Sequence, residues 1–314
     1  MNKPWLSVLM PVYNGGKYLA QALDSIVAQG DKDIECIAVD DGSTDSTPAI
    51  LESYMNGLPL RIIRQPHSGN WAANTNVALS HARGDHACIL HQDDMWLEHR
   101  LKIIRSLTEQ YPDTDMILHP SRFIDDQGRR LGPWRCPLPA LPAMINPDTL
   151  IGRLLTQNFI SIPAPVFKRE AALSVGGLDS RLWFTPDWDL WLKISCYGKV
   201  IYYPSPLSAF RIHSKSHTIV RSINIQDFRK ELETVFERHI ELWKTTERIK
   251  NAVRRTALFS IEMNVLFASI LHGKKSHPFK LIRLVITMGP LGLYRYFRDS
   301  RIIERLFARI KAKF

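Results

Sequence analysis

The sequence predicts an α/β protein built on a mostly parallel sheet, because strand-like and helix-like segments alternate through its first hundred residues. The expected strands are the β-rich runs Trp5–Val12, Glu35–Asp40, Leu60–Gln65 and His86–His91. The expected helices are Lys17–Ala28, Asp45–Met55, Trp71–His81 and Leu97–Gln110. Such βαβ units join parallel strands by right-handed connections. Ligands of these sheets bind at the carboxyl ends of the strands, so polar residues there are the first candidates for a site.

The pattern after residue 110 is less regular. The five prolines of residues 132–147 exclude a regular helix or a central strand, so we expect a loop over the site. The other expected elements are a strand at Met116–Phe123, a helix near Thr149–Gln157, a strand near Ile162–Phe167, a helix from about Pro186, and strands at Lys199–Tyr203 and Leu207–Ile212.

Composition is that of a folded globular protein, with 45% hydrophobic and 23% charged residues among 314. The four cysteines form no C-x-x-C pair, and buried free thiols in a reducing compartment explain them. No uncharged stretch of about 18 residues is present, and the first residues do not resemble a signal peptide. We therefore expect a cytoplasmic location.

The net charge of +10 is concentrated in residues 221–314, which hold 20 Lys and Arg against 9 Asp and Glu. The pattern there is helical from about Ser222, with breaks around Gly273–Pro278 and at Gly289–Pro290. We expect two parts, an α/β domain at 1–220 and a basic helical region at 221–314.

The segment Ile302–Ile310 places apolar and basic residues on opposite faces of a helix. Such a helix can lie on an anionic membrane, and this is the interaction we expect of the C-terminal region. A helical bundle that packs on the α/β domain or on a second subunit is the alternative. No nucleic-acid-binding module accompanies the charge, so nucleic acid is not an expected partner.

The first polar cluster follows the first strand, at Pro11, Tyr13 and Asn14 before two glycines. Glycines let the backbone approach a ligand, and the helix start offers free N–H groups to a phosphate. Tyr13 is placed to lie against a flat base. The spacing is not G-x-G-x-x-G, so a dinucleotide fingerprint is not supported, and a purely structural turn is the alternative.

The second cluster is Asp40-Asp41 at the end of the second strand. Asp45 and Gly42 just after it have structural explanations, as a helix cap and a tight turn. Adjacent carboxylates repel each other unless something compensates them. Hydrogen bonds from a base or a ribose would do so.

The third cluster, His91, Asp93 and Asp94, follows the fourth strand. A divalent cation on a diphosphate needs hard oxygen ligands, and one or two carboxylates commonly suffice. We expect Asp93 to be a metal ligand, His91 a second one, and Asp94 to lie nearer a ribose or in an outer shell. A helix-capping Asp94 and an ordinary polar His91 are the structural alternative.

Together these motifs resemble the family 2 glycosyltransferases, which have the GT-A fold, and the resemblance continues to His213. It implies a nucleoside-diphosphate sugar donor, a divalent cation (Mn²⁺ or Mg²⁺), and base and ribose contacts from the first two motifs. By resemblance, Tyr13 and Asp40 contact the base and Asp93 binds the metal. Two motifs depart from the family: its D-x-D reads His91-Gln92-Asp93 here, and its A-R-N-x-G reads Ala72-Ala73-Asn74-Thr75-Asn76.

A later segment resembles the E-D region of inverting members of this family, with Pro186 in place of the glutamate. The resemblance makes Asp187 the base that deprotonates the acceptor hydroxyl, a step this chemistry requires. An acidic residue in the first turn of a helix is the structural alternative. Trp183, Trp188 and Asp189 are expected near the acceptor or in the core.

The segment Phe210–His217 resembles the R-x-H segment that closes many such domains. By resemblance His213 is a metal ligand, and Arg211 lies behind it near the diphosphate. Cationic or metal-binding groups are useful there because the leaving group gathers negative charge.

The sequence therefore predicts an inverting, metal-dependent glycosyltransferase domain at residues 1–220. We expect it to act on a carbohydrate or lipid-linked acceptor in surface polysaccharide or glycolipid assembly, at the inner face of the cell membrane. Two alternatives stay open, a nucleotidyltransferase and a non-catalytic nucleotide-sugar-binding protein.

Overall fold

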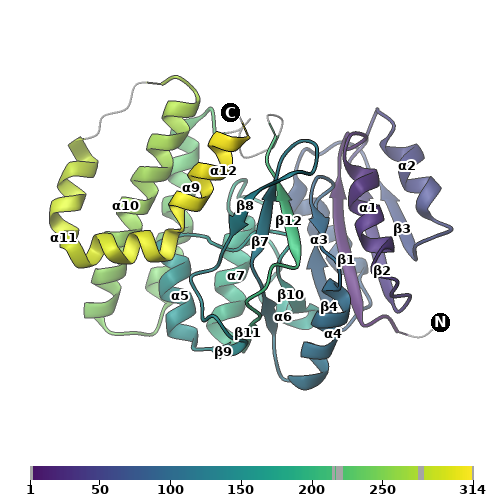
Figure 1. Cartoon of the computed structure of the whole chain (residues 1–314), viewed down its shortest axis with the longest axis horizontal. Helices are drawn as coiled ribbons and strands as arrows, with labels where there is room; N and C mark the ends of the chain where they lie inside the picture. Colours follow the sequence, from purple (N-terminus) through teal and green to yellow (C-terminus); the bar gives the residue numbers. More distant parts are fainter. Residues whose placement is uncertain (1–2, 214–215, 217–221, 275–278, 313–314) are drawn as a thin grey trace.

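The computed structural model describes residues 3–213, 216, 222–274 and 279–312 (Figure 1). An eight-stranded sheet in the order β3-β2-β1-β4-β10-β6-β11-β9 crosses the molecule. Its strands are β1 (Leu6–Val12), β2 (Ile34–Asp40), β3 (Leu60–Arg64), β4 (His86–Ile89), β6 (Met116–Leu118), β9 (Ala143–Ile145), β10 (Val166–Lys168) and β11 (Val200–Tyr202). The first four strands are mutually parallel, as the sequence predicted, and β10 is antiparallel to both of its neighbours.

Helices cover both faces of this sheet, which is why all seven residues of β1 and all seven of β2 are buried. Successive side chains of a strand point to opposite faces. Val8 and Met10 therefore pack in one core cluster with α1, α2 and α4, whereas Leu9 packs in another with α3, α5 and α7. These helices are α1 (Leu19–Val27), α2 (Thr47–Tyr54), α3 (Trp71–His81), α4 (Arg100–Gln110), α5 (Pro147–Thr156) and α7 (Pro186–Tyr197), and a short α6 (Arg169–Ser174) follows β10.

A second, four-stranded sheet has the order β5-β12-β7-β8. Its strands are β5 (Met95–Trp96), β7 (Ser121–Ile124), β8 (Arg130–Trp134) and β12 (Ser208–Arg211). The prediction of one strand over Met116–Phe123 was wrong, because the chain leaves the main sheet as β6 and enters the second sheet as β7. Pro120 stands at the break, where its missing N–H prevents a continuous ladder.

The proline-rich stretch contains more structure than expected. Its start forms the end of β8, and β9 follows, so the loop prediction was wrong at these two places. Both strands lie at the edge of their sheets, where proline is tolerated, so the exclusion of a central strand is confirmed. The strand expected near Ile162–Phe167 begins only at Val166.

All four cysteines are free thiols, as expected. Cys36, Cys88 and Cys136 are buried and Cys196 is half-buried. Burial raises the pKa of the Cys88 thiol to about 11, so this thiol stays protonated and behaves as a small apolar side chain.

The C-terminal region is helical, as predicted, and gathers at the opposite end of the molecule from the first strands (Figure 1). Its helices are α9 (Ile225–Leu242), α10 (Glu247–Leu271), α11 (Phe279–Ser300) and α12 (Ile302–Lys311). Phe236, Ile240 and Ile261 are buried in the same core cluster as α5 and α7, so α9 and α10 pack directly on the α/β part. Gly289, with φ 63°, interrupts α11 immediately before Pro290. Among the described helices none combines the length and apolarity that a bilayer crossing needs.

Candidate active site

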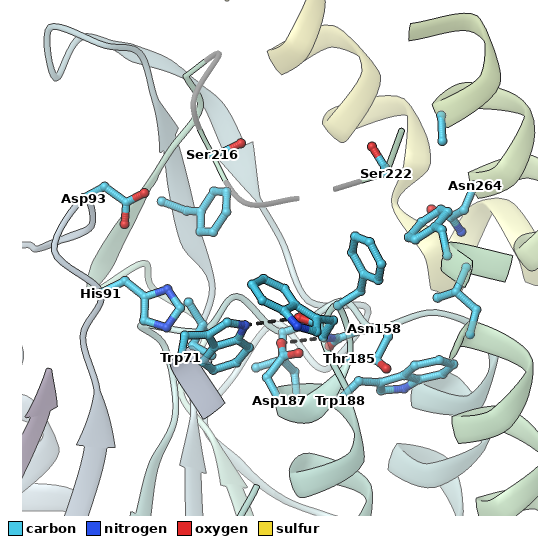
Figure 2. A pocket seen from close by; sticks show the side chains of 18 of the residues that line it. Trp71, His91, Asp93, Asn158, Thr185, Asp187, Trp188, Ser216, Ser222 and Asn264 are labelled. Atoms are coloured by element: carbon cyan, nitrogen blue, oxygen red, sulfur yellow. Dashed lines mark hydrogen bonds between the residues drawn. The ribbon is translucent and has the colours of Figure 1, made fainter. Parts of the chain in front are cut away.

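One cavity of about 490 Å³ lies at the carboxyl ends of the parallel strands and continues to the C-terminal helices (Figure 2). Eight of the predicted site residues line it: Pro11, Tyr13, Asp41, His91, Asp93, Trp183, Asp187 and Trp188. Six others do not line it but surround it or lie in the core: Asn14, Asp40, Asp94, Asp189, Arg211 and His213. The cavity therefore joins four motifs that are far apart in the sequence.

Hydrogen bonds hold the loop after β1 in a fixed conformation. The Tyr13 N–H donates to Gln92 Oε1 at 2.8 Å, and Gln92 Nε2 donates back to the Tyr13 carbonyl at 2.9 Å. Asn14 has a positive φ of 45° and accepts a hydrogen bond from the Thr44 N–H. Tyr13 stacks on the His67 ring with a centroid distance of 4.0 Å. The tyrosine is thus a positioned aromatic wall of the cavity.

The protein itself compensates both adjacent aspartates. Asp40 accepts from the Ser43 N–H at 3.0 Å, which closes the turn after β2. Asp41 accepts from the N–H and the hydroxyl of Ser68 and from the Gly69 N–H. Burial acts to raise the pKa of Asp41, but these hydrogen bonds together lower it by more. The pKa of Asp41 therefore lies below its usual range. Asp41, and not Asp40, is the carboxylate that reaches the cavity.

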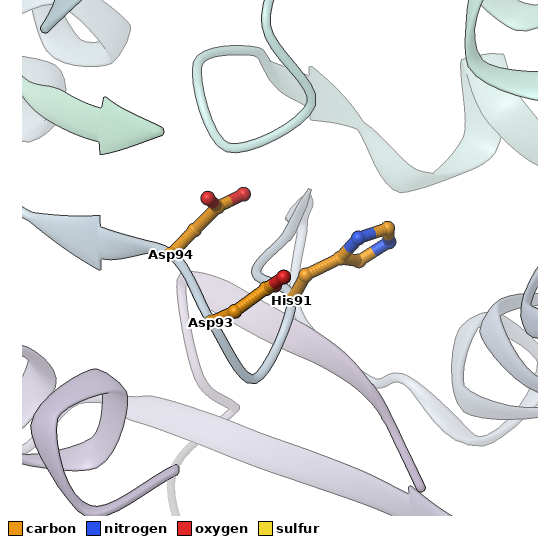
Figure 3. A group of neighbouring side chains, drawn as sticks. All are labelled: His91, Asp93 and Asp94. Atoms are coloured by element: carbon orange, nitrogen blue, oxygen red, sulfur yellow. The ribbon is translucent and has the colours of Figure 1, made fainter. Parts of the chain in front are cut away.

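The third cluster has the geometry of a cation site. Figure 3 shows His91, Asp93 and Asp94 projecting from one loop before β5, and one ligand atom of each lies within 4.8 Å of the others. Asp94 Oδ1 accepts from the Arg211 N–H at 3.0 Å, while its buried Oδ2 has no hydrogen-bond partner among the described residues. Asp93 Oδ2 lies 2.9 Å from His213 Nε2. Two carboxylates with an orphaned oxygen and two imidazoles nearby fit a divalent cation.

The two carboxylates of this cluster have opposite pKa shifts. Burial and the neighbouring Asp93 charge raise the pKa of Asp94 well above its usual value. Burial also raises the pKa of Asp93, but His213 and His91 lower it more, so the net shift is downward. Because like charges this close cannot both ionise cheaply, a bound cation would favour the charged form of both.

Arg211 supports the cluster from behind. Its guanidinium donates to the carbonyls of Asp93 and Asp125 and to Gln21 Oε1, each at 2.8 Å, and lies over the Tyr18 ring. The side chain is buried and does not line the cavity. In this structure it positions the loop that carries Asp93.

Asp187 lies in the first turn of α7 and points into the cavity between the cation cluster and the C-terminal helices (Figure 2). Its Oδ2 accepts from Asn158 Nδ2 at 3.0 Å. Burial raises the pKa of Asp187 to about 6, although the Trp188 N–H and the Asn158 amide oppose the shift. Glu231 of α9 holds the preceding turn by accepting from the Thr185 N–H at 2.8 Å. A carboxylate with this pKa is suited to accept a proton near neutral pH.

The two predicted tryptophans lie beside Asp187. Trp183 accepts at its carbonyl from Trp71 Nε1 at 3.1 Å, and both residues line the cavity. Trp188 is buried and donates from Nε1 to the Leu154 carbonyl at 2.9 Å. Trp183 therefore offers more surface to a ligand than Trp188 does.

Asp189 is fully buried and turned away from the cavity. It pairs with Lys193 at 2.6 Å and with Arg238 and His239 at 2.8 Å each. These contacts attach α7 to α9, so the observed role of this carboxylate is structural.

The comparison with known families agrees with the geometry. The family model for Glycosyl transferase family 2 matches residues 7–166, which is half of the chain. The chain belongs to glycosyl transferase family 2. The resemblance inferred from the motifs is thereby confirmed.

Two relatives of this family 2 member show how far the similarity extends along the chain. A Rickettsia typhi protein named an uncharacterized glycosyltransferase is 28% identical over 226 residues, which cover 68% of this chain and 66% of that protein. An uncharacterized Mycobacterium bovis protein is 30% identical over 215 residues, which cover 67% of this chain and 59% of that protein. The chain thus spans only about three fifths to two thirds of these relatives' length.

Solved structures confirm the GT-A fold of this family 2 member. S. aureus TarS (residues 1–349) in complex with UDP-GlcNAc superposes with a TM-score of 0.68 at 19% identity, covering 98% of this chain and 90% of TarS. The mannosyltransferase PcManGT from Pyrobaculum calidifontis, in complex with GDP-Man and Mn²⁺, superposes with a TM-score of 0.60 at 16% identity. The match covers 100% of this chain and 88% of PcManGT.

Sequence reasoning missed several residues of this family 2 site. Gln92 occupies the middle of the altered D-x-D motif, where only the flanking positions drew attention. Asn158 follows a helix with no motif around it. Arg305 and Arg309 line the cavity from α12, whose amphipathic pattern indicated a membrane surface or, as the alternative, packing on the α/β domain or on a second subunit.

Proposed function

We propose that this protein transfers a sugar from a nucleoside-diphosphate sugar to an acceptor hydroxyl, with inversion and with help from a divalent cation. The observation that carries this proposal is one cavity lined by Asp93 of the cation cluster and by Asp187, whose pKa is raised to about 6. A cation-binding group for a leaving diphosphate and a proton acceptor are the two requirements of this reaction. Family membership supports the reaction class.

The nucleotide is proposed to bind at the ends of β1 and β2. Tyr13 offers its ring to the base, and Asp41 offers a charged carboxylate to donors on the base or ribose. Pro11 lines the same part of the cavity, while Asn14 and Asp40 fix the two loops. Mutually hydrogen-bonded loops reduce the ordering cost of binding a nucleotide.

The donor diphosphate is proposed to lie at the cation cluster. Asp93 and His91 would hold the cation, His213 would contribute through its Nε2, and Asp94 would support them. A divalent cation there neutralises the charge that develops on the leaving diphosphate. Arg211 keeps the Asp93 loop in place for this purpose.

Asp187 is proposed to take the proton of the acceptor hydroxyl. As that proton moves to the carboxylate, the acceptor oxygen forms a bond to the anomeric carbon, and the bond from that carbon to the diphosphate oxygen breaks. The nucleoside diphosphate leaves with the bonding electron pair. Attack on the face opposite the leaving group inverts the configuration.

The acceptor is proposed to be a carbohydrate or a lipid-linked sugar in surface polysaccharide or glycolipid assembly. Apolar side chains stand exposed on α12, and residues 221–314 together carry a net charge of +11. The exposed residues are Ile303, Leu306, Phe307 and Ile310. Apolar groups amid cations suit an anionic bilayer surface, which supports peripheral binding at the inner face of the cell membrane.

A ligand screen tests the donor part of the proposal. Purified protein is heated with UDP-, GDP-, dTDP- or CMP-sugars in Mn²⁺, Mg²⁺ or EDTA, and the unfolding temperature is measured. One nucleotide class should stabilise the protein only with metal, in wild type and in Asp187→Ala but not in Asp93→Ala. Stabilisation by nucleoside triphosphates with pyrophosphate release would support a nucleotidyltransferase instead. Donor binding without sugar transfer to any acceptor would support a binding protein.

Vesicle sedimentation tests the membrane part. Vesicles with anionic lipid should bind the wild type, and Leu306→Glu combined with Phe307→Glu should abolish binding while donor-induced stabilisation persists. Equal sedimentation of this variant and the wild type would exclude α12 as the membrane contact.

A further inference from the structure

Helix α12 is anchored over the second sheet. Its Ala308 is buried in a small core cluster that includes Trp134 of β8. Glu304 accepts from the Arg135 N–H at 3.0 Å and pairs with the Arg135 guanidinium at 3.2 Å. These contacts fix the rotation of the helix about its axis, and with it the direction of its remaining side chains.

Two arginines on the inner face of α12 line the cavity, Arg305 and Arg309. A spacing of four residues places them one turn apart on the same face. The Arg305 guanidinium lies 5.4 Å from the centre of the Trp134 ring. The cavity thus has a cationic part that the predicted motifs do not include.

The charges of the described residues compensate this cationic part only in part, because the Asp187 charge opposes the pKa shift of Arg305 without cancelling it. The buried Nη1 of Arg305 has no hydrogen-bond partner among the described residues. The Arg309 guanidinium is not paired with a carboxylate among the described residues, and burial lowers the pKa of this side chain. Burial lowers the pKa of Arg305 to about 10, and the Arg309 charge contributes to that shift. Two neighbouring cations in a partly dry cavity are costly, and a bound anion would remove the cost.

The position of the arginines decides which part of the reaction this anion belongs to. The cation cluster stands at one side of the cavity, and the C-terminal helices stand at the other, with Asp187 between them (Figure 2). Asp187 is close enough for its charge to act on the Arg305 guanidinium. Since the donor diphosphate belongs with the cation cluster, an anion at Arg305 and Arg309 lies on the acceptor side of Asp187.

We propose that Arg305 and Arg309 bind a phosphate group of the acceptor, so that the substrate hydroxyl reaches Asp187 from a phosphate-bearing molecule. Two guanidinium groups can each donate paired hydrogen bonds to phosphate oxygens. This inference rests on the proposed function for the identity of the acceptor side. The phosphate can belong to a lipid-linked acceptor or to a soluble sugar or polyol phosphate.

Calorimetric titration with matched probes tests the proposal. The soluble pair is glycerol 3-phosphate and glycerol, and the lipid pair is farnesyl phosphate and farnesol. Each phosphate should bind about tenfold more tightly than its alcohol, because charge-assisted hydrogen bonds are lost with the phosphate. If farnesyl phosphate binds more tightly than glycerol 3-phosphate, the phosphate belongs to a lipid-linked acceptor. If the two bind with equal affinity, it belongs to a soluble acceptor.

Variants of α12 identify the binding groups. Arg305→Gln and Arg309→Gln should each remove most of the phosphate preference, while Arg309→Lys should keep part of it. Lys311→Gln is the matched control, because it removes a charge from the same helix outside the cavity. Arg309 is not paired with a carboxylate among the described residues, so Arg309→Gln should leave the fold intact. If Arg305→Gln proves unstable, Arg309→Gln still separates an effect on ligand binding from an effect on folding.

Two outcomes would overturn the proposal. If neither phosphate binds more tightly than its matching alcohol, a phosphate subsite is excluded. An equal loss of nucleotide-sugar binding in both glutamine variants would place the arginines on the donor instead. Failure of the proposed function is distinguishable from these outcomes. In that case the wild type does not bind a nucleotide sugar in a metal-dependent way, whereas the phosphate titration still measures binding at Arg305 and Arg309 of α12.

Discussion

The side-chain amide of Asn158 donates a hydrogen bond of 3.0 Å to the carboxylate of Asp187. Asn158 follows α5 and Asp187 lies in the first turn of α7, and the two line the same cavity. The bond favours the charged carboxylate, whereas burial favours the neutral one, and burial prevails with a pKa of about 6. This pair therefore controls the pH at which the proposed base becomes competent.

We expect the rate of sugar transfer to rise with pH through about 6, because only the ionised Asp187 can accept a proton. Asn158→Leu removes the donor that favours ionisation, so the acidic limb of kcat/KM should move to higher pH. The measurement is a pH–rate profile of both proteins. Asn264→Leu is the matched control, since this amide also lines the cavity but bonds to Gln157, and it should leave the limb in place. An unchanged limb in Asn158→Leu would contradict the assignment.

Asp187→Asn should make the protein more stable and less active. The folded-state pKa is raised, so ionised Asp187 costs stability above pH 6, and the cost disappears as the pH falls towards 3.8. The variant should therefore unfold at a higher temperature than wild type near pH 8, with the difference shrinking at lower pH. Transfer should fall by about 100-fold or more, since a positioned base contributes that much. Thermal unfolding at several pH values and initial rates measure both effects, and a variant less stable at pH 8 would refute the pKa argument.

His91→Asp should strengthen cation binding. The substitution supplies the first carboxylate of the D-x-D motif, close to Asp93. Mg²⁺ and Mn²⁺ bind hard oxygen ligands in preference to an imidazole. We expect the Kd of Mg²⁺ to fall by about tenfold with the added ligand charge. Calorimetric titration of Mg²⁺ in the presence of the nucleotide measures it. Asp85→Asn, an exposed site away from the cavity, is the control, and weaker binding in His91→Asp would argue against direct ligation at position 91.

Asp189→Ala should destabilise the fold. The variant leaves the buried His239 and the partly buried Arg238 and Lys193 without their shared carboxylate. Breaking such a network by removing one partner costs about 3–5 kcal/mol. Urea unfolding followed by circular dichroism gives the free energy of unfolding. Glu237→Ala breaks the more exposed pair with Arg254 and should cost about 0–1 kcal/mol, so similar losses in the two variants would show that Asp189 is not the anchor of α9.

Local patterns predicted the four parallel strands and their helices because they report which face of each segment is apolar. Trp71–His81 begins and ends where expected. The same patterns failed at Met116–Phe123, where buried residues continue through Pro120 although the chain changes sheets. A run of apolar residues indicates burial but not the sheet in which a residue is buried.

The sequence by itself determined the family, the α/β fold, and the candidate clusters at Tyr13, Asp93 and Asp187, since these follow from periodicity and short motifs. Only the tertiary structure decided that Asp41 and not Asp40 faces the cavity, because hydrogen bonds from Ser68 and Gly69 orient it. Only the tertiary structure brought Arg305 and Arg309 to the same cavity, since the rotation of α12 is set by its contacts with β8. An amphipathic sequence specifies two faces of a helix, and long-range packing decides what each face meets.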